Sequence, residues 1–226
     1  MTPGQRGDAE PNSAPGSVLG RDHAGVLVLA TRNGHKVAEL RRILDEAGLE
    51  IELLDVAEAE ARTGRSIPEV PETGATFADN ARLKAEAVSA ASGLPAVADD
   101  SGLCVAALNG MPGVLSARWS GTGDDIANVE LVLAQVADVG PDRRQAEFVC
   151  AAALSTPGMD TVVELGVLAG SLVQTPRGAN GFGYDPIFVP DGNTRTTAEM
   201  TPEQKDAISH RGRAFRAMAV RIADSQ

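Results

Sequence analysis

The chain has 226 residues, a hydrophobic fraction of 43%, an aromatic fraction of only 3% and a formal net charge of −11. This length suits one larger domain or two compact lobes with a substantial core. The negative charge argues against a nucleic-acid or anionic-membrane surface, because either would need a broad basic face. A small anionic ligand held by a local basic cluster stays compatible with it.

Residues 1–24 are rich in Gly, Pro, Ser and Asp and lack the apolar core of a signal peptide. We predict a disordered leader over 1–24 and a single folded domain over 25–226. Apolar stretches fall short of membrane-spanning length, which predicts a cytoplasmic protein. Cys104 and Cys150 lie in apolar runs, so we expect buried, reduced thiols.

The first elements follow an α/β pattern. Residues 26–31 (VLVLAT) are a short apolar run that predicts a buried strand. The next segment predicts a helix that ends at Gly48 and has one apolar stripe: Val37, Leu40, Leu44 and Ala47. Residues 51–56 predict a second strand, so the chain opens strand–loop–helix–strand.

The remaining elements alternate in the same manner. A polar loop over 57–75 precedes a helix that begins with a capping box of Thr76 and Asp79. The later elements that we predict are a strand over 95–99, a loop over 109–123, a helix over 124–139, antiparallel strands over 146–155 and 161–174, a glycine-rich loop over 176–188 and a helix over 200–223. Thr201, Pro202 and Gln204 give that last helix its N-terminal signals.

The stretch ATRNGHK (30–36) connects the first strand to the first helix. The N-terminus of a helix presents free backbone N–H groups and a positive dipole end, and Lys36 adds a full charge, which favours phosphate binding. The glycine spacings of Walker and Rossmann loops are absent. A plain connection is an equally good interpretation of this stretch alone.

The stretch ADDSG (98–102) places two adjacent carboxylates after an apolar run. Side chains of an extended segment alternate, so Asp99 and Asp100 should point to opposite sides. A carboxylate at a strand end suits Mg²⁺, which takes one or two carboxylates with phosphate oxygens and water. An Asx-turn or helix cap is the structural alternative. Glu69 or Glu72, on the polar loop, could supply a second carboxylate to such a site. The alternative is that both are solvated loop charges.

Two further stretches concentrate ring and donor groups. In GANGFGYDPIF, glycines allow close backbone approach and aromatic rings offer a face for a base, with Asp185 able to accept from ring N–H groups. In EQKDAISHRGRA, Lys205, His210 and Arg211 supply donors suited to a carbonyl or phosphate. A tight turn with buried aromatics and a basic helix surface are the respective structural alternatives.

Six blocks in order resemble the inosine-triphosphate pyrophosphatase family: LATRNGHKVAEL, ETGATFADNARLKA, ADDSGL, GMPGVLSARWSG, GFGYDPIF and AEMTPEQKDAISHRGRA. The resemblance covers nearly the whole chain after the leader. It implies hydrolysis of ITP, dITP or XTP to the monophosphate and pyrophosphate, with Mg²⁺ as cofactor. It also implies a homodimer of an elongated α/β fold, in which helices flank a central twisted mixed β-sheet and a cleft separates two lobes.

The resemblance implies the site residues as well. The triphosphate would be held by a phosphate loop and one helical face: Thr31, Arg32, Asn33, Gly34, His35, Lys36, Asn80 and Lys84. Asp100 would be the catalytic acid–base and a metal ligand, with Glu72 as the second metal ligand and Glu69 as the alternative. The substrate and its base would contact Ser101, Phe182, Gly183, Tyr184, Asp185, Lys205, His210 and Arg211. Phe182 would stack on the purine, and His210 and Arg211 would face its 6-keto edge.

One position departs from the family pattern. Arg32 stands where many relatives have glycine, so the phosphate loop must avoid the positive φ that glycine permits. Two other functions stay open. A Maf-like pyrophosphatase would act on other nucleotides, although its Ser-x-Ser-Pro-Arg-Arg loop is unlike ATRNGHK. A non-catalytic nucleotide-binding dimer would keep the pocket without turnover.

Overall fold

The computed structural model describes residues 19, 25–32 and 34–224, so the predicted leader over 1–24 lies outside the described residues except for the buried Leu19. The strands are β1 (Val26–Leu29), β2 (Glu52–Leu54), β3 (Ala96–Val105), β4 (Gln145–Ser155), β5 (Val162–Leu172) and β6 (Phe188–Pro190). The α-helices are α1 (Gly34–Glu46), α2 (Val56–Thr63), α3 (Phe77–Ser92), α4 (Asp125–Gln135), α5 (Pro202–Ile208) and α6 (His210–Ala223).

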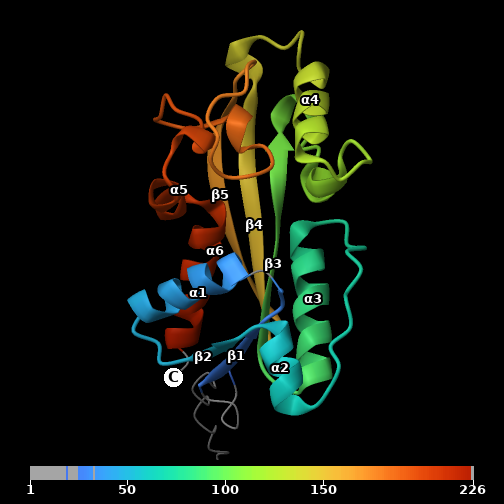
Figure 1. The fold of residues 1–226 in the computed structure, drawn as a ribbon, viewed down its shortest axis with the longest axis vertical. Helices are drawn as coiled ribbons and strands as arrows, with labels where there is room; N and C mark the ends of the chain where they lie inside the picture. Colours follow the sequence, from blue (N-terminus) through green and yellow to red (C-terminus); the bar gives the residue numbers. More distant parts are fainter. Residues whose placement is uncertain (1–18, 20–24, 33, 225–226) are drawn as a thin grey trace, which may run out of the picture.

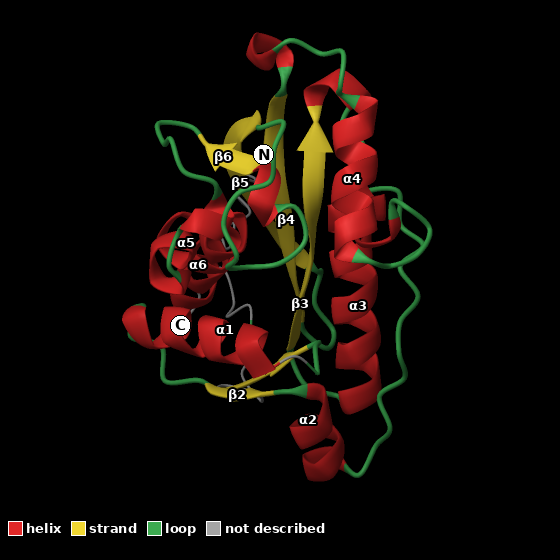
Figure 2. Cartoon of the chain, turned by 45° about the horizontal axis from the view of Figure 1, so that its top comes forward, coloured by secondary structure: helices red, strands yellow, loops and turns green. Residues whose placement is uncertain are grey.

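The strands form one mixed sheet in the order β2-β1-β3-β4-β5-β6. β1 pairs in parallel with β2 and β3, whereas β3, β4, β5 and β6 are successive antiparallel neighbours. The predicted α/β class with a mixed sheet is confirmed, as is the antiparallel pair β4–β5. Helices lie on both sides of the strands, with α3 and α4 on one side and α1, α5 and α6 on the other (Figures 1 and 2).

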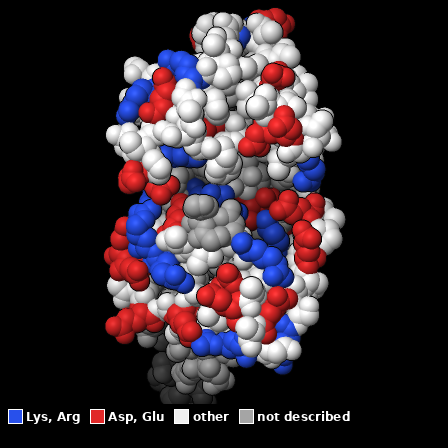
Figure 3. All heavy atoms as spheres, in the orientation of Figure 1, with Lys and Arg blue, Asp and Glu red and all other residues white. Residues whose placement is uncertain are grey.

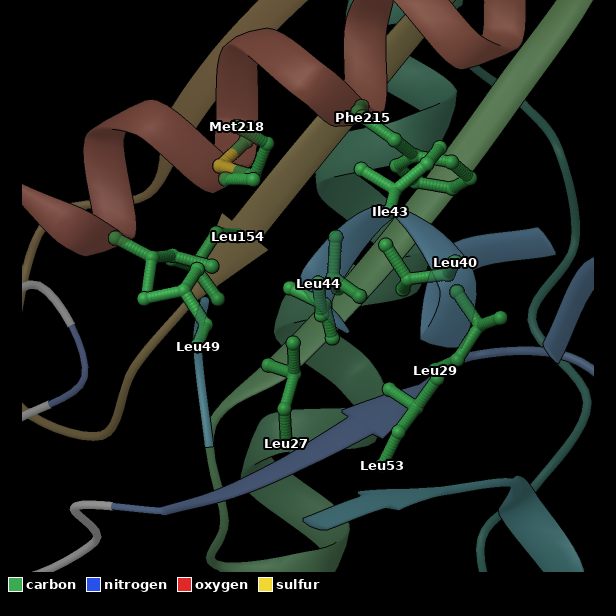
Figure 4. Close-up of a cluster of buried hydrophobic side chains, with 14 of the residues drawn as sticks. Leu27, Leu29, Leu40, Ile43, Leu44, Leu49, Leu53, Leu154, Phe215 and Met218 are labelled. Carbon is green, nitrogen blue, oxygen red and sulfur yellow. The ribbon is translucent and has the colours of Figure 1, made fainter. Parts of the chain in front are cut away.

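The α1/α6 side of the sheet buries the largest apolar cluster (Figure 4). Leucines of β1 and β2 meet the inner faces of α1 and α6 there, and the labelled side chains are Leu27, Leu29, Leu40, Ile43, Leu44, Leu49, Leu53, Leu154, Phe215 and Met218. Val97 of β3 belongs to the same cluster. The apolar stripe predicted for the first helix is therefore the face that packs on the sheet.

The α3 side is built from smaller residues. Ala98, Ala151 and Ala153 of the sheet pack against Phe77, Ala81 and Ala85 of α3. Adjacent residues Val97 and Ala98 thus face opposite layers, as strand alternation requires. The same alternation continues along β3 through the next two residues, Asp99 and Asp100.

A glycine brings α6 close to the sheet. A Cβ placed on Gly166 of β5 would lie 2.0 Å from the carbonyl oxygen of His210 and 2.5 Å from the backbone nitrogen of Ala214. No other residue type fits there without moving the helix. Gly166 therefore helps to fix where the first turn of α6 lies.

Several predicted boundaries are wrong in the structure. Residues 57–75 were predicted to be a polar loop, but the first part of this segment belongs to α2. Asp55 and Glu58 form the capping box that starts this helix. The final helix is two helices, because Ser209 has extended ψ (146°) and separates α5 from α6. ADDSG lies within β3 and not at a strand end, since β4 pairs with β3 along its whole length.

The described part of the chain contains no helix long and apolar enough to cross a membrane. The capping box of Thr76 and Asp79 at the start of α3 is confirmed, and so are the N-terminal signals of α5. The cysteines are free, and Cys150 is fully buried while Cys104 is partly buried. Burial raises the pKa of the Cys104 thiol to about 11, which keeps it protonated at neutral pH.

Candidate functional site

The two adjacent aspartates of β3 point to opposite layers of the molecule, as predicted. Asp100 faces α3, where Asn80 Nδ2 donates to its Oδ2 at 2.9 Å. Lys84 Nζ lies 3.9 Å from its Oδ1, one helical turn further along α3. The four-residue spacing of Asn80 and Lys84 therefore brings an amide and an ammonium to the same carboxylate.

Glu72 lies beside this carboxylate through a shared lysine. Lys84 Nζ donates to Glu72 Oε1 at 2.8 Å, and Arg118 Nη1 lies 3.8 Å from Glu72 Oε2. Burial raises the pKa of Asp100, the Asn80 hydrogen bond and the Lys84 charge oppose that rise, and the Glu72 charge adds to it. A partly buried carboxyl with a raised pKa is a form suited to proton transfer.

A cavity of about 1070 Å³ is lined by two members of this group, Glu72 and Lys84. It is lined by both candidate glutamates, Glu69 and Glu72, and by cationic side chains of four segments: Arg32, Lys36, Lys84 and Arg118. The acidic chain thus gathers positive charge locally, as the composition allowed. Figure 3 shows Lys and Arg side chains around the middle of one face, among acidic ones.

The donor set fits a hard divalent cation that is held partly by its substrate. No group of three or more His, Cys, Asp or Glu side chains suited to a metal occurs among the described residues. Mg²⁺ needs only one or two carboxylates, with phosphate oxygens and water completing its shell. Asp100 and Glu72, both paired with the ammonium of Lys84, are two neighbouring carboxylates of the kind that such a site needs.

The predicted phosphate loop follows β1. Gly34 and His35 open α1, Thr31 lines the cavity, and Asn33 lies outside the described residues. Arg32 is exposed, and its guanidinium lies 3.4 Å from Glu60 of α2. Thr31, Arg32 and Lys36 therefore line the same cavity as Glu72.

Asp99 faces the opposite layer and forms ion pairs with two basic side chains, Lys36 and Arg211. Lys36 Nζ donates to both of its oxygens, at 2.9 and 3.0 Å, and Arg211 Nε donates to Oδ2 at 3.0 Å. Burial would raise the pKa of Asp99, but the charges of Lys36 and Arg211 outweigh burial and hold this pKa well below its usual range.

A second cavity, of about 700 Å³, lies on the α1/α6 side and is lined by Lys36, Phe182, Lys205, His210 and Arg211. It adjoins a smaller one of about 130 Å³ that also reaches Ser101 and Tyr184. Phe182 is 66% exposed, and Lys205 Nζ lies 4.8 Å from the centroid of its ring. The exposed ring is available to stack on a planar ligand.

His210 is held as a neutral imidazole. Its ring stacks on Phe148 with centroids 5.0 Å apart and an interplanar angle of 13°. Burial, with the positive charges of Arg211 and Lys205, lowers the pKa of His210 to about 3. Arg211 Nη2 donates to Ser101 Oγ at 3.3 Å, so this part of the pocket is fixed to β3.

Three predicted contact residues are largely buried: Asn80, Tyr184 and Asp185. The Asn80 side chain bridges Gly74 N and Asp100, and the Tyr184 hydroxyl donates to Ser116 O at 2.9 Å. Asp185 pairs with Lys205 and accepts from Phe182 N and Thr197 Oγ1. In this structure these groups hold the loop and its neighbours, and their contact with a substrate stays a prediction.

Two residues of the site were missed from sequence. Arg118 belongs to the block GMPGVLSARWSG, whose arginine is the signal that was available. Phe148 lies in an ordinary apolar strand, and nothing local distinguishes it. Gly183 N donates to Asp125 Oδ2 at 2.8 Å, so α4 also anchors the glycine-rich loop.

Comparison with known proteins gives a consistent result. A model of the Ham1 family matches residues 27–221. A dITP/XTP pyrophosphatase of Streptomyces coelicolor is 59% identical over 194 residues, which cover 85% of this chain and 94% of the relative. A Mycobacterium tuberculosis protein of the same name is 56% identical over 191 residues, covering 84% of this chain and 91% of the relative.

Solved structures also resemble the chain. A HAM1 protein from Coxiella burnetii superposes with a TM-score of 0.80 at 39% identity, covering 88% of this chain and 99% of that one. A nucleoside-triphosphatase / dITP/XTP pyrophosphatase from Mycobacterium abscessus gives 0.73 at 54% identity, covering 85% and 97%.

Proposed function

The chain belongs to the Ham1 family, and we propose that it hydrolyses the non-standard purine nucleoside triphosphates dITP, XTP and ITP to the monophosphate and pyrophosphate. One observation carries the chemistry. Asp100, beside Asn80, Lys84 and Glu72, shares strand β3 with Asp99, which holds Lys36 and Arg211. A basic group for a triphosphate and a donor pocket for a base thus adjoin one candidate general base.

Asp100 takes a proton from water in this proposal. The water oxygen forms a bond to the α-phosphorus, the bond from that phosphorus to the bridging oxygen of the β-phosphate breaks, and pyrophosphate leaves. Lys36, Lys84 and Arg118, which line one cavity, neutralise charge on the triphosphate. Asn80 orients the carboxylate by donating to Oδ2.

Asp100 and Glu72 would hold Mg²⁺, with Glu69 as the alternative ligand on the same cavity. When bound, the metal supplies positive charge at the phosphate oxygens. Lys84 now occupies the space between the two carboxylates, so it would exchange partners when a triphosphate enters. Chelation with EDTA is expected to abolish turnover, and added Mg²⁺ to restore it.

The base pocket favours a 6-keto purine. His210, neutral at pH 7, and Arg211 supply N–H donors, whereas adenine presents an amino group that would leave buried donors unpaired. Phe182 would stack on the purine ring, and Lys205 Nζ lies over the Phe182 ring, 4.8 Å from its centroid. Ser101, Gly183, Tyr184 and Asp185 complete this wall.

A substrate panel tests the proposal. ITP and XTP with Mg²⁺ should release pyrophosphate, with ATP slower by about 100-fold or more. Phosphate as the first product would contradict it. Hydrolysis of UTP or dTTP in preference to ITP would favour a Maf-like enzyme, and binding without turnover would favour a nucleotide-binding dimer.

Asp100→Asn tests the catalytic role. The amide keeps the size of the side chain but cannot accept the proton, so turnover should fall by at least about 1000-fold with Tm nearly unchanged. Glu164→Gln on β5, which loses an ion pair with Arg221 away from the pocket, is the matched control and should keep full activity.

We also propose that the protein is a cytoplasmic homodimer with one domain over 25–226. Exposed apolar side chains on β5, Leu165 and Val167, support an interface there. Light scattering after gel filtration tests the dimer, and Leu165→Glu should shift it toward monomer. An unchanged mass in that variant would place the interface elsewhere.

A further inference from the structure

Asp99 contacts residues of both the predicted phosphate-binding part and the predicted base-binding part of the site, but it lines neither cavity. Its side chain is 3% exposed, against 26% for Lys36 and 13% for Arg211. Both cations reach the same carboxylate oxygen, Oδ2, at 3.0 Å. Asp99 of β3 therefore bonds to one side chain of α1 and one side chain of α6.

The two cations belong to different parts of the site. Lys36 lines both the large cavity beside Asp100 and the cavity on the α1/α6 side. Arg211 lines the latter and the small pocket with Phe182 and Tyr184. The common carboxylate therefore fixes the distance between the predicted phosphate-binding and base-binding donors.

We propose that Asp99 is a positioning residue that sets Lys36 and Arg211 relative to each other, so that one nucleotide engages both at once. This inference rests on the proposed function. A lysine side chain is flexible and strongly hydrated, so a buried carboxylate with two contacts restricts its ammonium to one place.

A purely structural ion pair is the competing explanation. Buried ion pairs are weak evidence for stability, because desolvation offsets much of their attraction. A structural role changes the amount of folded protein but leaves kcat/KM per folded molecule unchanged. If Asp99 is a positioning residue, its substitution lowers kcat/KM. This loss should occur only while the side chains that it positions, Lys36 and Arg211, are present.

The test combines Asp99→Asn with Lys36→Gln and Arg211→Gln, measuring pyrophosphate release from ITP. Asp99→Asn should lower kcat/KM by about 100-fold, as expected when a binding group moves by about 1 Å. In the Lys36→Gln or Arg211→Gln background, the same change should cost less than about tenfold, because its target is gone. Glu164→Gln, which also removes a carboxylate from an α6 arginine, should leave kcat/KM unchanged.

Asp99→Glu keeps the charge and provides a variant if the asparagine form does not fold. Its longer side chain displaces both cations, so kcat/KM should still fall by at least about tenfold. Wild-type kcat/KM in the folded Asp99 variants, or a full loss repeated in every background, overturns the proposal. An inactive wild-type chain would instead overturn the proposed function.

Discussion

At the scale of single residues, His210 shows how neighbours determine protonation. Its ring is stacked on Phe148 and lies near the charges of Arg211 and Lys205, so the neutral form is favoured and its pKa falls to about 3. In the unfolded chain a histidine has a pKa of about 6.5. Between these two values the unfolded chain binds one proton more than the folded chain.

This difference predicts a pH-dependent stability. The free energy of unfolding should fall as pH decreases from about 6.5 toward 3, by up to about 1.4 kcal/mol per pH unit from His210, and should gain nothing from it above pH 7. His210→Gln removes the contribution. Urea unfolding of both proteins from pH 4.5 to 8 measures it, and parallel stability curves would contradict the assignment.

The aspartate pair shows what could be predicted from sequence at this scale. Period-two alternation was enough to send Asp99 and Asp100 to opposite layers. The partners of Asp99 were not predictable, because Lys36 and Arg211 are 63 and 112 positions away along the chain. A local sequence pattern thus predicts which way a strand side chain points. Its long-range contacts depend on how α1 and α6 pack on the sheet.

At the scale of elements, caps were better predictors than hydrophobic pattern. Thr76 and Thr201 correctly marked the starts of α3 and α5. Asp55 with Glu58 carried the same signal for α2 but stood in a segment that we predicted to be loop. Ser209 was hidden inside a helical pattern, although its side chain accepts from Gly212 N at 2.9 Å and starts α6.

Ser209→Ala should therefore destabilise the protein. Loss of an N-cap costs about 1 kcal/mol, which for a chain of this size lowers Tm by roughly 2–4 °C. Because His210 is the first residue of α6, discrimination of ITP against ATP should also weaken. Thr201→Ala, a cap on α5, is the control for stability. An unchanged Tm in Ser209→Ala would refute the capping role.

At the scale of the whole molecule, the sheet combines two kinds of pairing. β3, β4 and β5 pair antiparallel over nearly their full length, whereas β1 joins β3 in parallel through Val28–Ala96 and Leu29–Val97 only. The sequence predicted both regions, since strand and helix signals alternate early and strands follow one another later. It did not predict the sheet order, which depends on where β1 inserts.

That short parallel junction makes one end of the sheet the part most ready to open. The amides of β1 and β2 should exchange with deuterium well before those of central β4, since fewer ladder bonds must break.

The phosphate loop follows β1, so the free energy of binding an anion there stabilises that end of the sheet. Pyrophosphate with Mg²⁺ at 100 times its Kd should slow exchange in β1 and α1 by up to about 100-fold, leaving β4 little changed. Uniform slowing would mean that the chain opens as one unit. A local effect would mean that the bound product reversibly stabilises this edge of the sheet against local unfolding.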